Sequence, residues 1–150
     1  MLLDWSVAAR FECRSELPPA YDRIERVLRE IDVVWLLPVS SVLEALFEVE
    51  HSTPIYTGLL RFNDVQLNAP ATQHFSIVAE DARRPLFIEQ LRRPTFAASG
   101  LNTKCGFVTY PEVFRWHRRV TATAGDLAIT TPPGGPFEPS TRPPNLDSGS

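Results

Sequence analysis

Three acidic residues of this chain stand where they could act together on a metal ion. Asp32 begins an apolar segment, and sixteen residues later Glu48 and Glu50 alternate along a second one. Alternate residues of a strand share a face, and so do residues opposite each other in an antiparallel pair. A turn centred near Ser41 would place Asp32 opposite Glu50 and Val34 opposite Glu48. Three carboxylates on one face repel each other unless a cation neutralises them or one takes up a proton. Hard oxygen ligands with room for water suit Mg²⁺ or Mn²⁺.

A purely structural interpretation of the same pattern is a strand with one solvated face. In that case Glu48 and Glu50 line the solvated face, while Phe47 and Val49 line the buried one. For an isolated Glu-x-Glu this is the commoner situation. Two details favour the site instead. The acidic pair lies at the end of its strand, where open α/β sheets tend to place their sites, and Asp32 begins a strand that is otherwise apolar.

The segments around these acids alternate between helical and strand patterns. Helices are expected near residues 19–31, 53–67, 83–92 and 113–120, and strands near 32–37, 43–50, 75–79 and 106–110. The short connection after residue 37 makes the first two strands an antiparallel hairpin, whereas strands separated by helices imply a parallel or mixed remainder. The predicted fold class is α/β, with a central mixed β-sheet of about four strands flanked by helices.

Length and composition indicate one globular unit. The chain has 150 residues, 43% of them apolar, which is enough for one sizeable core. We expect a single domain over residues 1–131 and a disordered, proline-rich tail over residues 132–150. Cys13 and Cys105 stand far apart without a thiolate cluster, and no leader or membrane-spanning segment is recognisable. A soluble cytoplasmic protein without a membrane partner is expected.

Five ordered segments carry a family resemblance. They are IDVVWL (31–36), FEVEHST (47–53), GLLRFND (58–64), RRPTF (92–96) and FVTYPEV (107–113). An acid before one strand and Glu-x-Glu on the next, flanked by helices, resembles the restriction-endonuclease-like superfamily of nucleases, usually written PD-(D/E)xK. The five segments together resemble bacterial domains of that kind, and the match covers roughly residues 20 to 115.

The resemblance implies roles for the three acids. Asp32 and Glu48 would bind a divalent ion, Mg²⁺ or Mn²⁺, and Glu50 stands where the superfamily commonly has a lysine. That lysine is thought to orient water or to stabilise the charge that develops on phosphate. Some members carry Glu there and still cut DNA. In an active site of this kind the metal would polarise the phosphate and lower the pKa of the attacking water, with Glu50 ligating or accepting its proton.

Further residues are candidates for supporting roles. Glu25 stands about where superfamily members often place an additional acid near the metal, and the alternative is a solvent-exposed residue. The helix that follows the acidic strand can bind an anion at its N-terminus. Candidate phosphate contacts are Thr57, Arg61, Arg92 and Arg93. Ordinary solvated helix faces explain these arginines equally well.

Two functional hypotheses follow, and a third stays open. The first is a divalent-metal-dependent DNA phosphodiester hydrolase of the bacterial restriction or defence type. The second is a catalytically degenerate nuclease-like domain that serves as a nucleic-acid or protein interaction module, which the missing lysine and the net charge of −3 favour. The third is a plain α/β scaffold that contacts another protein through Trp5 and Phe11. Nuclease domains of this kind often dimerise to cut two strands, so a homodimer is a further expectation of the resemblance.

Overall fold

A computed structural model describes residues 14–37 and 40–122 of the chain. Its strands are β1 (Val33–Leu36), β2 (Leu43–Val49), β3 (His74–Ala79) and β4 (Cys105–Thr109). The α-helices are α2 (Glu25–Glu30), α3 (Ile55–Asn68), α4 (Arg84–Leu91), α5 (Pro94–Ser99) and α6 (Tyr110–Ala122), and short 3₁₀ helices are η1 (Pro19–Ile24), η2 (Asp81–Arg83) and η3 (Leu101–Thr103). The predicted tail over residues 132–150 lies outside the described residues, and so do Trp5 and Phe11 near the N-terminus.

The four strands form one mixed sheet in the order β1-β2-β3-β4. The hairpin strands β1 and β2 are antiparallel, whereas β2 with β3 and β3 with β4 are parallel. Each parallel step crosses over through helices, as parallel neighbours require. The predicted α/β class with a mixed sheet of about four strands is therefore confirmed.

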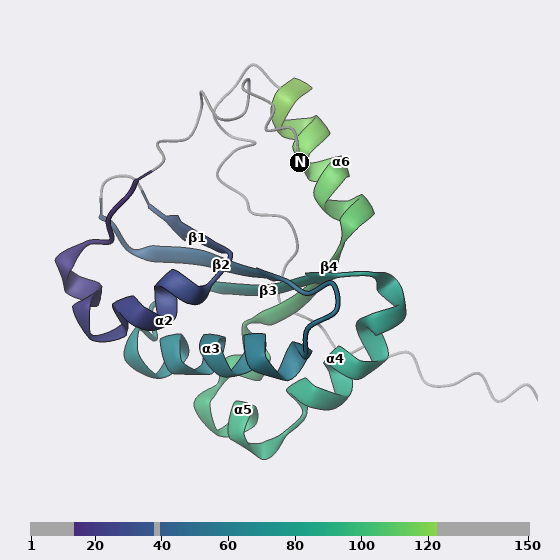
Figure 1. The fold of residues 1–150 in the computed structure, drawn as a ribbon, viewed down its shortest axis with the longest axis horizontal. Coiled ribbons are helices and arrows are strands. Elements are labelled where there is room, and N and C mark those ends of the chain that lie inside the picture. Colours follow the sequence, from purple (N-terminus) through teal and green to yellow (C-terminus); the bar gives the residue numbers. More distant parts are fainter. Residues whose placement is uncertain (1–13, 38–39, 123–150) are drawn as a thin grey trace, which may run out of the picture.

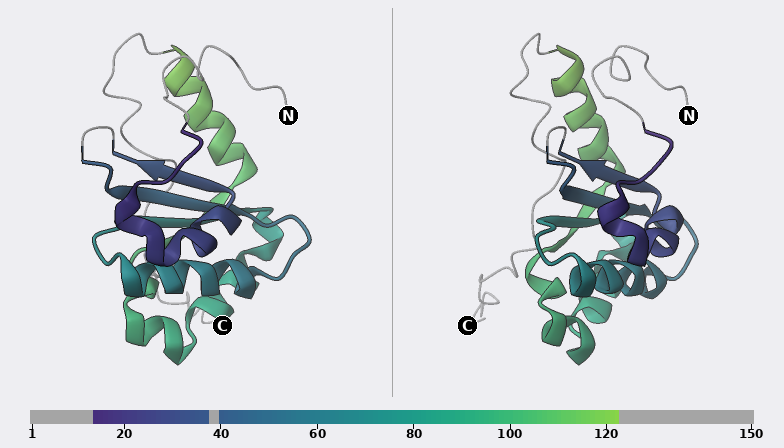
Figure 2. Two further views of the ribbon diagram at one scale, coloured as in Figure 1. Left: turned by 60° about the vertical axis from the view of Figure 1, so that its left-hand side comes forward. Right: turned by 90° about the vertical axis from the view of Figure 1, so that its left-hand side faces the viewer.

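Helices cover both faces of this sheet (Figures 1 and 2). One face carries α2, α3, α4 and α5 over the larger core cluster, in which rings such as Phe62 and Phe75 pack with centroids 5.2 Å apart. Helix α6 covers part of the opposite face, above a smaller cluster that contains Phe47 and Val108. Because each face has its own apolar layer, either side of β2 can bury a side chain.

Two helix boundaries differ from the sequence prediction. Helix α3 begins at Ile55 with Pro54 as its N-cap, so Thr53 precedes the helix and does not cap it. The helix expected near residues 83–92 is α4, which ends at Leu91, and Pro94 opens the short helix α5, which was not predicted. Proline is well tolerated in the first turn of a helix, because the N–H it lacks would have no partner there. None of the helices in residues 14–37 and 40–122 is both long and apolar enough to cross a membrane.

Candidate functional site

The end of β2 buries two carboxylates. Glu48 is 2% exposed and Glu50 is 3% exposed, while Val49 between them is 46% exposed. A Cβ built on Gly58 of α3 would lie 2.9 Å from Glu50 Oε1 and 3.4 Å from Glu48 Cβ, so both acids point toward α3. The interpretation that placed them on a solvated face is therefore wrong. The acidic side of the strand is the side covered by α3.

Asp32 joins Glu48, through a register that differs from the expected one. Val33 pairs with Phe47 and Val34 with Leu46, so the continuing ladder brings Asp32 across from Glu48 rather than Glu50. The prediction was wrong by two residues, and because the shift is even, the residues keep their faces. The Asp32 carboxylate accepts a hydrogen bond from the Val49 N–H, with Oδ2 2.8 Å from N. The exposed Asp32 is thereby held at the end of β2, beside the buried Glu48.

Glu50 belongs to a loop that is tied down from two sides. Its carboxylate accepts a hydrogen bond from the Thr53 hydroxyl. The Arg83 guanidinium donates to the Glu50 carbonyl oxygen at 2.8 Å and to the Thr53 carbonyl oxygen at 2.7 Å. The close approach of α3 to Glu50 depends on the missing side chain at Gly58. Glu50 is therefore held in the β2–α3 connection, with its carboxylate oriented by Thr53.

A cation on α3, Arg61, contacts Glu48. Arg61 Nη1 lies 3.0 Å from Glu48 Oε1, and Arg61 Nε lies 3.4 Å from Glu30 Oε2 at the end of α2. The Arg61 side chain is 28% exposed. Arg61 was a candidate phosphate contact, and in the structure it bridges the carboxylates of Glu48 and Glu30.

The Glu48 carboxyl has an unusual proton affinity. Burial raises its pKa from 4.5 to about 7; the Arg61 hydrogen bond and charge oppose this, and the neighbouring Asp32 adds to it. The ion pair in turn raises the pKa of Arg61 above its ordinary value. The interaction with Arg61 therefore does not fully offset the cost of burying the ionised Glu48 carboxylate.

Within the described part of the chain, the other predicted residues form no hydrogen bond or ion pair with Asp32, Glu48 or Glu50. Glu25 forms an i,i+4 ion pair with Arg29 at 2.6 Å. Thr57 is exposed in the first turn of α3, and Arg92 is exposed at the end of α4. The Arg93 guanidinium lies over the Tyr56 ring, 4.5 Å from its centroid, and therefore close to the start of α3.

The donor set fits a small divalent cation held by two protein side chains. Across the described residues no group of three or more His, Cys, Asp or Glu side chains could hold a metal ion. Asp32 and Glu48 supply hard oxygen atoms beside each other at the end of β2. Mg²⁺ often binds through one or two carboxylates and completes its shell with water and substrate phosphate. A cation beside Asp32 and Glu48 would offset the charges of the two carboxylates.

Sequence reasoning did not identify Glu30, Thr53, Gly58 or Arg83 as members of this site. Gly58 had a usable signal, because glycine inside a helix costs about 1 kcal/mol relative to alanine and therefore often marks a close contact. The ion pair with Glu30 had no such signal, since it depends on how α2 lies against α3.

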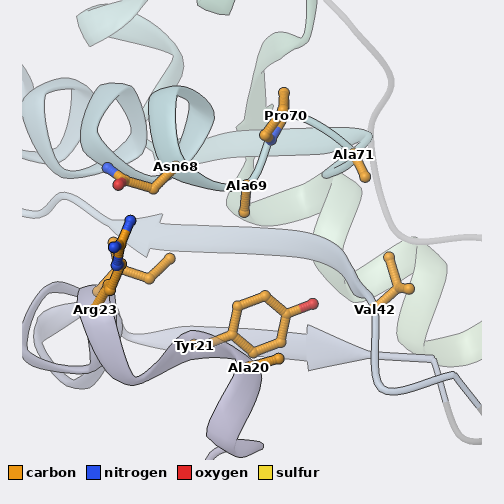
Figure 3. Close-up of a pocket in the computed structure, with 9 residues that line it drawn as sticks. Ala20, Tyr21, Arg23, Val42, Asn68, Ala69, Pro70 and Ala71 are labelled. Carbon is orange, nitrogen blue, oxygen red and sulfur yellow. The ribbon is translucent and has the colours of Figure 1, made fainter.

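A pocket elsewhere on the molecule is separate from the acids. It has a volume of about 270 Å³ and lies between η1 and the C-terminal end of α3, with Tyr21, Arg23 and Asn68 among its lining residues (Figure 3). No carboxylate lines it. The chemistry available at the end of β2 is absent from this pocket.

Comparison with known proteins gave one family. The model described as the C-terminal domain of the type II restriction enzyme NmeDI matches residues 9–120. The matched range contains Asp32, Glu48 and Glu50 and extends from before η1 into α6. No curated protein and no solved structure matches the chain.

Proposed function

The chain belongs to the family of the NmeDI C-terminal domain of type II restriction enzymes, and from this premise we propose that it is a divalent-metal-dependent DNA phosphodiester hydrolase. In this proposal it is a variant of the PD-(D/E)xK superfamily with Glu-x-Glu in place of Glu-x-Lys, and it acts in bacterial restriction or defence. The observation that carries the proposal is the juxtaposition of Asp32, fixed on the Val49 N–H, with the buried Glu48.

Asp32 and Glu48 are the residues proposed to hold Mg²⁺ or Mn²⁺. The bound ion would supply Lewis acidity toward a phosphate oxygen and would lower the pKa of a bound water. Asp32 is kept in place by the β2 backbone and Glu48 by its burial. Ligands that are already oriented need little reorganisation when the substrate arrives.

The reaction is hydrolysis of a phosphate ester. The water oxygen forms a bond to phosphorus, the bond from phosphorus to the leaving sugar oxygen breaks, and a proton from the water must be taken up while the leaving oxygen gains one. Glu50 is the proposed proton acceptor, because its carboxylate follows Glu48 on the same face and is oriented by the Thr53 hydroxyl.

The start of α3 is the proposed contact for the DNA backbone. Thr57 is exposed there, and Arg93 is held nearby against Tyr56. A helix N-terminus with an arginine beside it attracts phosphate oxygens. Arg92 is exposed next to Arg93 and would extend this surface. A homodimer would bring two such sites to the two strands of a duplex.

A cleavage assay tests the proposal. Purified protein with Mg²⁺ or Mn²⁺ is expected to cut DNA, and Glu48→Ala is expected to abolish cutting. Glu89→Gln, an exposed carboxylate on α4, serves as the matched control and should cut like the wild type. Unchanged cutting by Glu48→Ala would refute the assignment of the site. Calorimetric titration with Mn²⁺ provides a second measurement, in which Asp32→Asn and Glu48→Ala should each lose the binding heat.

One observation favours the alternative of a degenerate interaction module. Position 50 carries a buried glutamate bound to Thr53, and the Glu48 carboxylate already has the Arg61 cation as its partner. A site in which an arginine permanently replaced the metal would keep its fold without cutting DNA. This alternative predicts that the wild-type protein shows neither Mn²⁺ binding heat nor cleavage, although it could still bind DNA.

A further inference from the structure

The end of β2 carries a glutamate and no cation at position 50. Glu50 is buried and bonded to the Thr53 hydroxyl. Negative charge develops on the phosphate oxygens during hydrolysis of a phosphodiester, and positive charge close to those oxygens stabilises the transition state. Another cation must supply it if the site is active.

Three arginines lie around the end of β2, and their partners distinguish them. Arg83 directs both terminal nitrogens at the carbonyl oxygens of Glu50 and Thr53, so it holds the loop. Arg93 lies over the Tyr56 ring at the margin of the site. Arg61 contacts the carboxylate of Glu48 itself, at 3.0 Å. Arg61 is therefore the arginine of these three that touches a proposed metal ligand.

The Arg61 guanidinium retains capacity for a ligand. Nη1 is used by Glu48 and Nε by Glu30, while Nη2 has no hydrogen-bond partner among the described residues. The Arg61 side chain as a whole is 28% exposed. The planar guanidinium matches the geometry of phosphate oxygens and keeps its charge at any pH at which the protein is folded.

Two features hold Arg61 in this place. Gly58, one turn earlier on α3, lets the helix approach β2 so closely that a Cβ there would meet Glu50 Oε1 at 2.9 Å. Glu30, at the end of the neighbouring helix α2, holds the guanidinium from the other side at 3.4 Å. Helices α2 and α3 run beside each other under the sheet (Figures 1 and 2).

We propose that Arg61 is a catalytic residue that supplies the positive charge absent from position 50, through contact with the scissile phosphate beside Asp32 and Glu48, and that Glu30 is its positioning residue. The inference rests on the proposed hydrolase function. It differs from a general phosphate contact because it places Arg61 at the reacting phosphate.

Four variants test the proposal: Arg61→Gln, Arg61→Lys, Glu30→Gln and Glu89→Gln. The last is the control, because Glu89 is an exposed carboxylate on α4 with no role in the proposed site. Measurements are kcat and KM for Mn²⁺-dependent cleavage of a DNA duplex, Mn²⁺ affinity by calorimetry and the thermal unfolding midpoint.

Arg61→Gln is expected to lower kcat about 100-fold or more, the loss typical of removing a donor to the transition state, and to leave Mn²⁺ affinity equal or tighter. Arg61→Lys should recover part of that kcat, since it restores the charge without the fork. Glu30→Gln should lower kcat by roughly 3- to 10-fold with little change in KM, as expected of lost orientation. Glu89→Gln should match the wild type.

The outcomes separate this inference from the proposed function. If the wild type and Glu89→Gln cut DNA, Glu48→Ala does not, and Arg61→Gln cuts as fast as the wild type, the function stands and the role of Arg61 is refuted. Loss of Mn²⁺ binding or of the folded state in both Arg61→Gln and Arg61→Lys would also refute it, because Arg61 would then be structural. A wild type that binds no Mn²⁺ and cuts no DNA refutes both.

Discussion

The buried Glu48 predicts a specific pH dependence of folding stability. In the folded protein its pKa is about 7, raised from 4.5 by burial against the partial compensation of Arg61. A carboxyl group with a raised pKa in the folded state binds more protons there than in the unfolded chain at intermediate pH. The contribution of Glu48 to the free energy of unfolding is therefore most favourable below pH 4.5, decreases between pH 4.5 and pH 7, and stays at its lower value above pH 7.

The size of this effect follows from the difference between the two pKa values. Each pKa unit corresponds to about 1.36 kcal/mol, so the free energy of unfolding is expected to fall by about 3 kcal/mol across this interval because of Glu48 alone. Total stabilities of domains this size are about 5–15 kcal/mol, which makes the change readily measurable.

The assay compares urea unfolding of the wild type, Glu48→Gln and Glu89→Gln at half-unit steps from pH 4 to pH 8.5. Glu48→Gln removes the carboxylate of Glu48 from Arg61 at every pH, and this adds a constant difference to the free energy of unfolding. The pH-dependent part of the difference should therefore report Glu48, with the variant gaining about 3 kcal/mol on the wild type as pH rises. Glu89→Gln alters an exposed carboxylate and should follow the wild-type curve. A constant difference between Glu48→Gln and the wild type would refute the account of the buried carboxyl.

Three further predictions concern the same region. Gly58→Ala should lower the free energy of unfolding by about 1–3 kcal/mol despite the higher helix propensity of alanine, because its Cβ would lie 2.9 Å from Glu50 Oε1. Adding Glu50→Ala should recover part of this loss, as measured by thermal unfolding. If the losses of the two substitutions simply add, the proposed clash is contradicted. Arg83→Gln should remove both bonds to the β2–α3 loop and speed amide hydrogen exchange there, with the exposed Arg92→Gln as control; unchanged exchange would show that the loop does not depend on Arg83. Mn²⁺ at one hundred times its dissociation constant should stabilise the wild type by about 2.7 kcal/mol at neutral pH and leave Glu48→Gln unchanged, so equal stabilisation of both proteins would exclude this carboxylate as a ligand.

Local sequence patterns correctly predicted much of the architecture. Apolar periodicity located the four strands and most helices, and the short connection before β2 specified the antiparallel hairpin. These features depend on residues within a few positions of each other, which is why they can be recognised in a single sequence. The second helical segment after β3 was missed, because Pro94 is compatible with both the end of one helix and the first turn of another.

The face of β2 that holds the acids could be defined only in part. Strand alternation places Glu48 and Glu50 on one side and Phe47 and Val49 on the other. It does not say which side is covered, and here helices lie on both. Apolar side chains are usually buried and charged ones exposed, but here Val49 is exposed and Glu48 is buried. Glu48 faces α3, whereas the side of the strand that carries Val49 is open at this end.

The sequence by itself determined which acids can meet, because hairpin parity keeps Asp32 and Glu48 on one face even when the register shifts by two residues. Only the tertiary structure decided their environment. The approach of α3 at Gly58 buries the carboxylates, and the packing of α2 against α3 places Arg61 between Glu48 and Glu30. Arg61 is 13 positions from Glu48 and 31 positions from Glu30 in the sequence, and the three residues belong to different elements. Their geometry follows from packing of the whole domain, which local propensity does not encode.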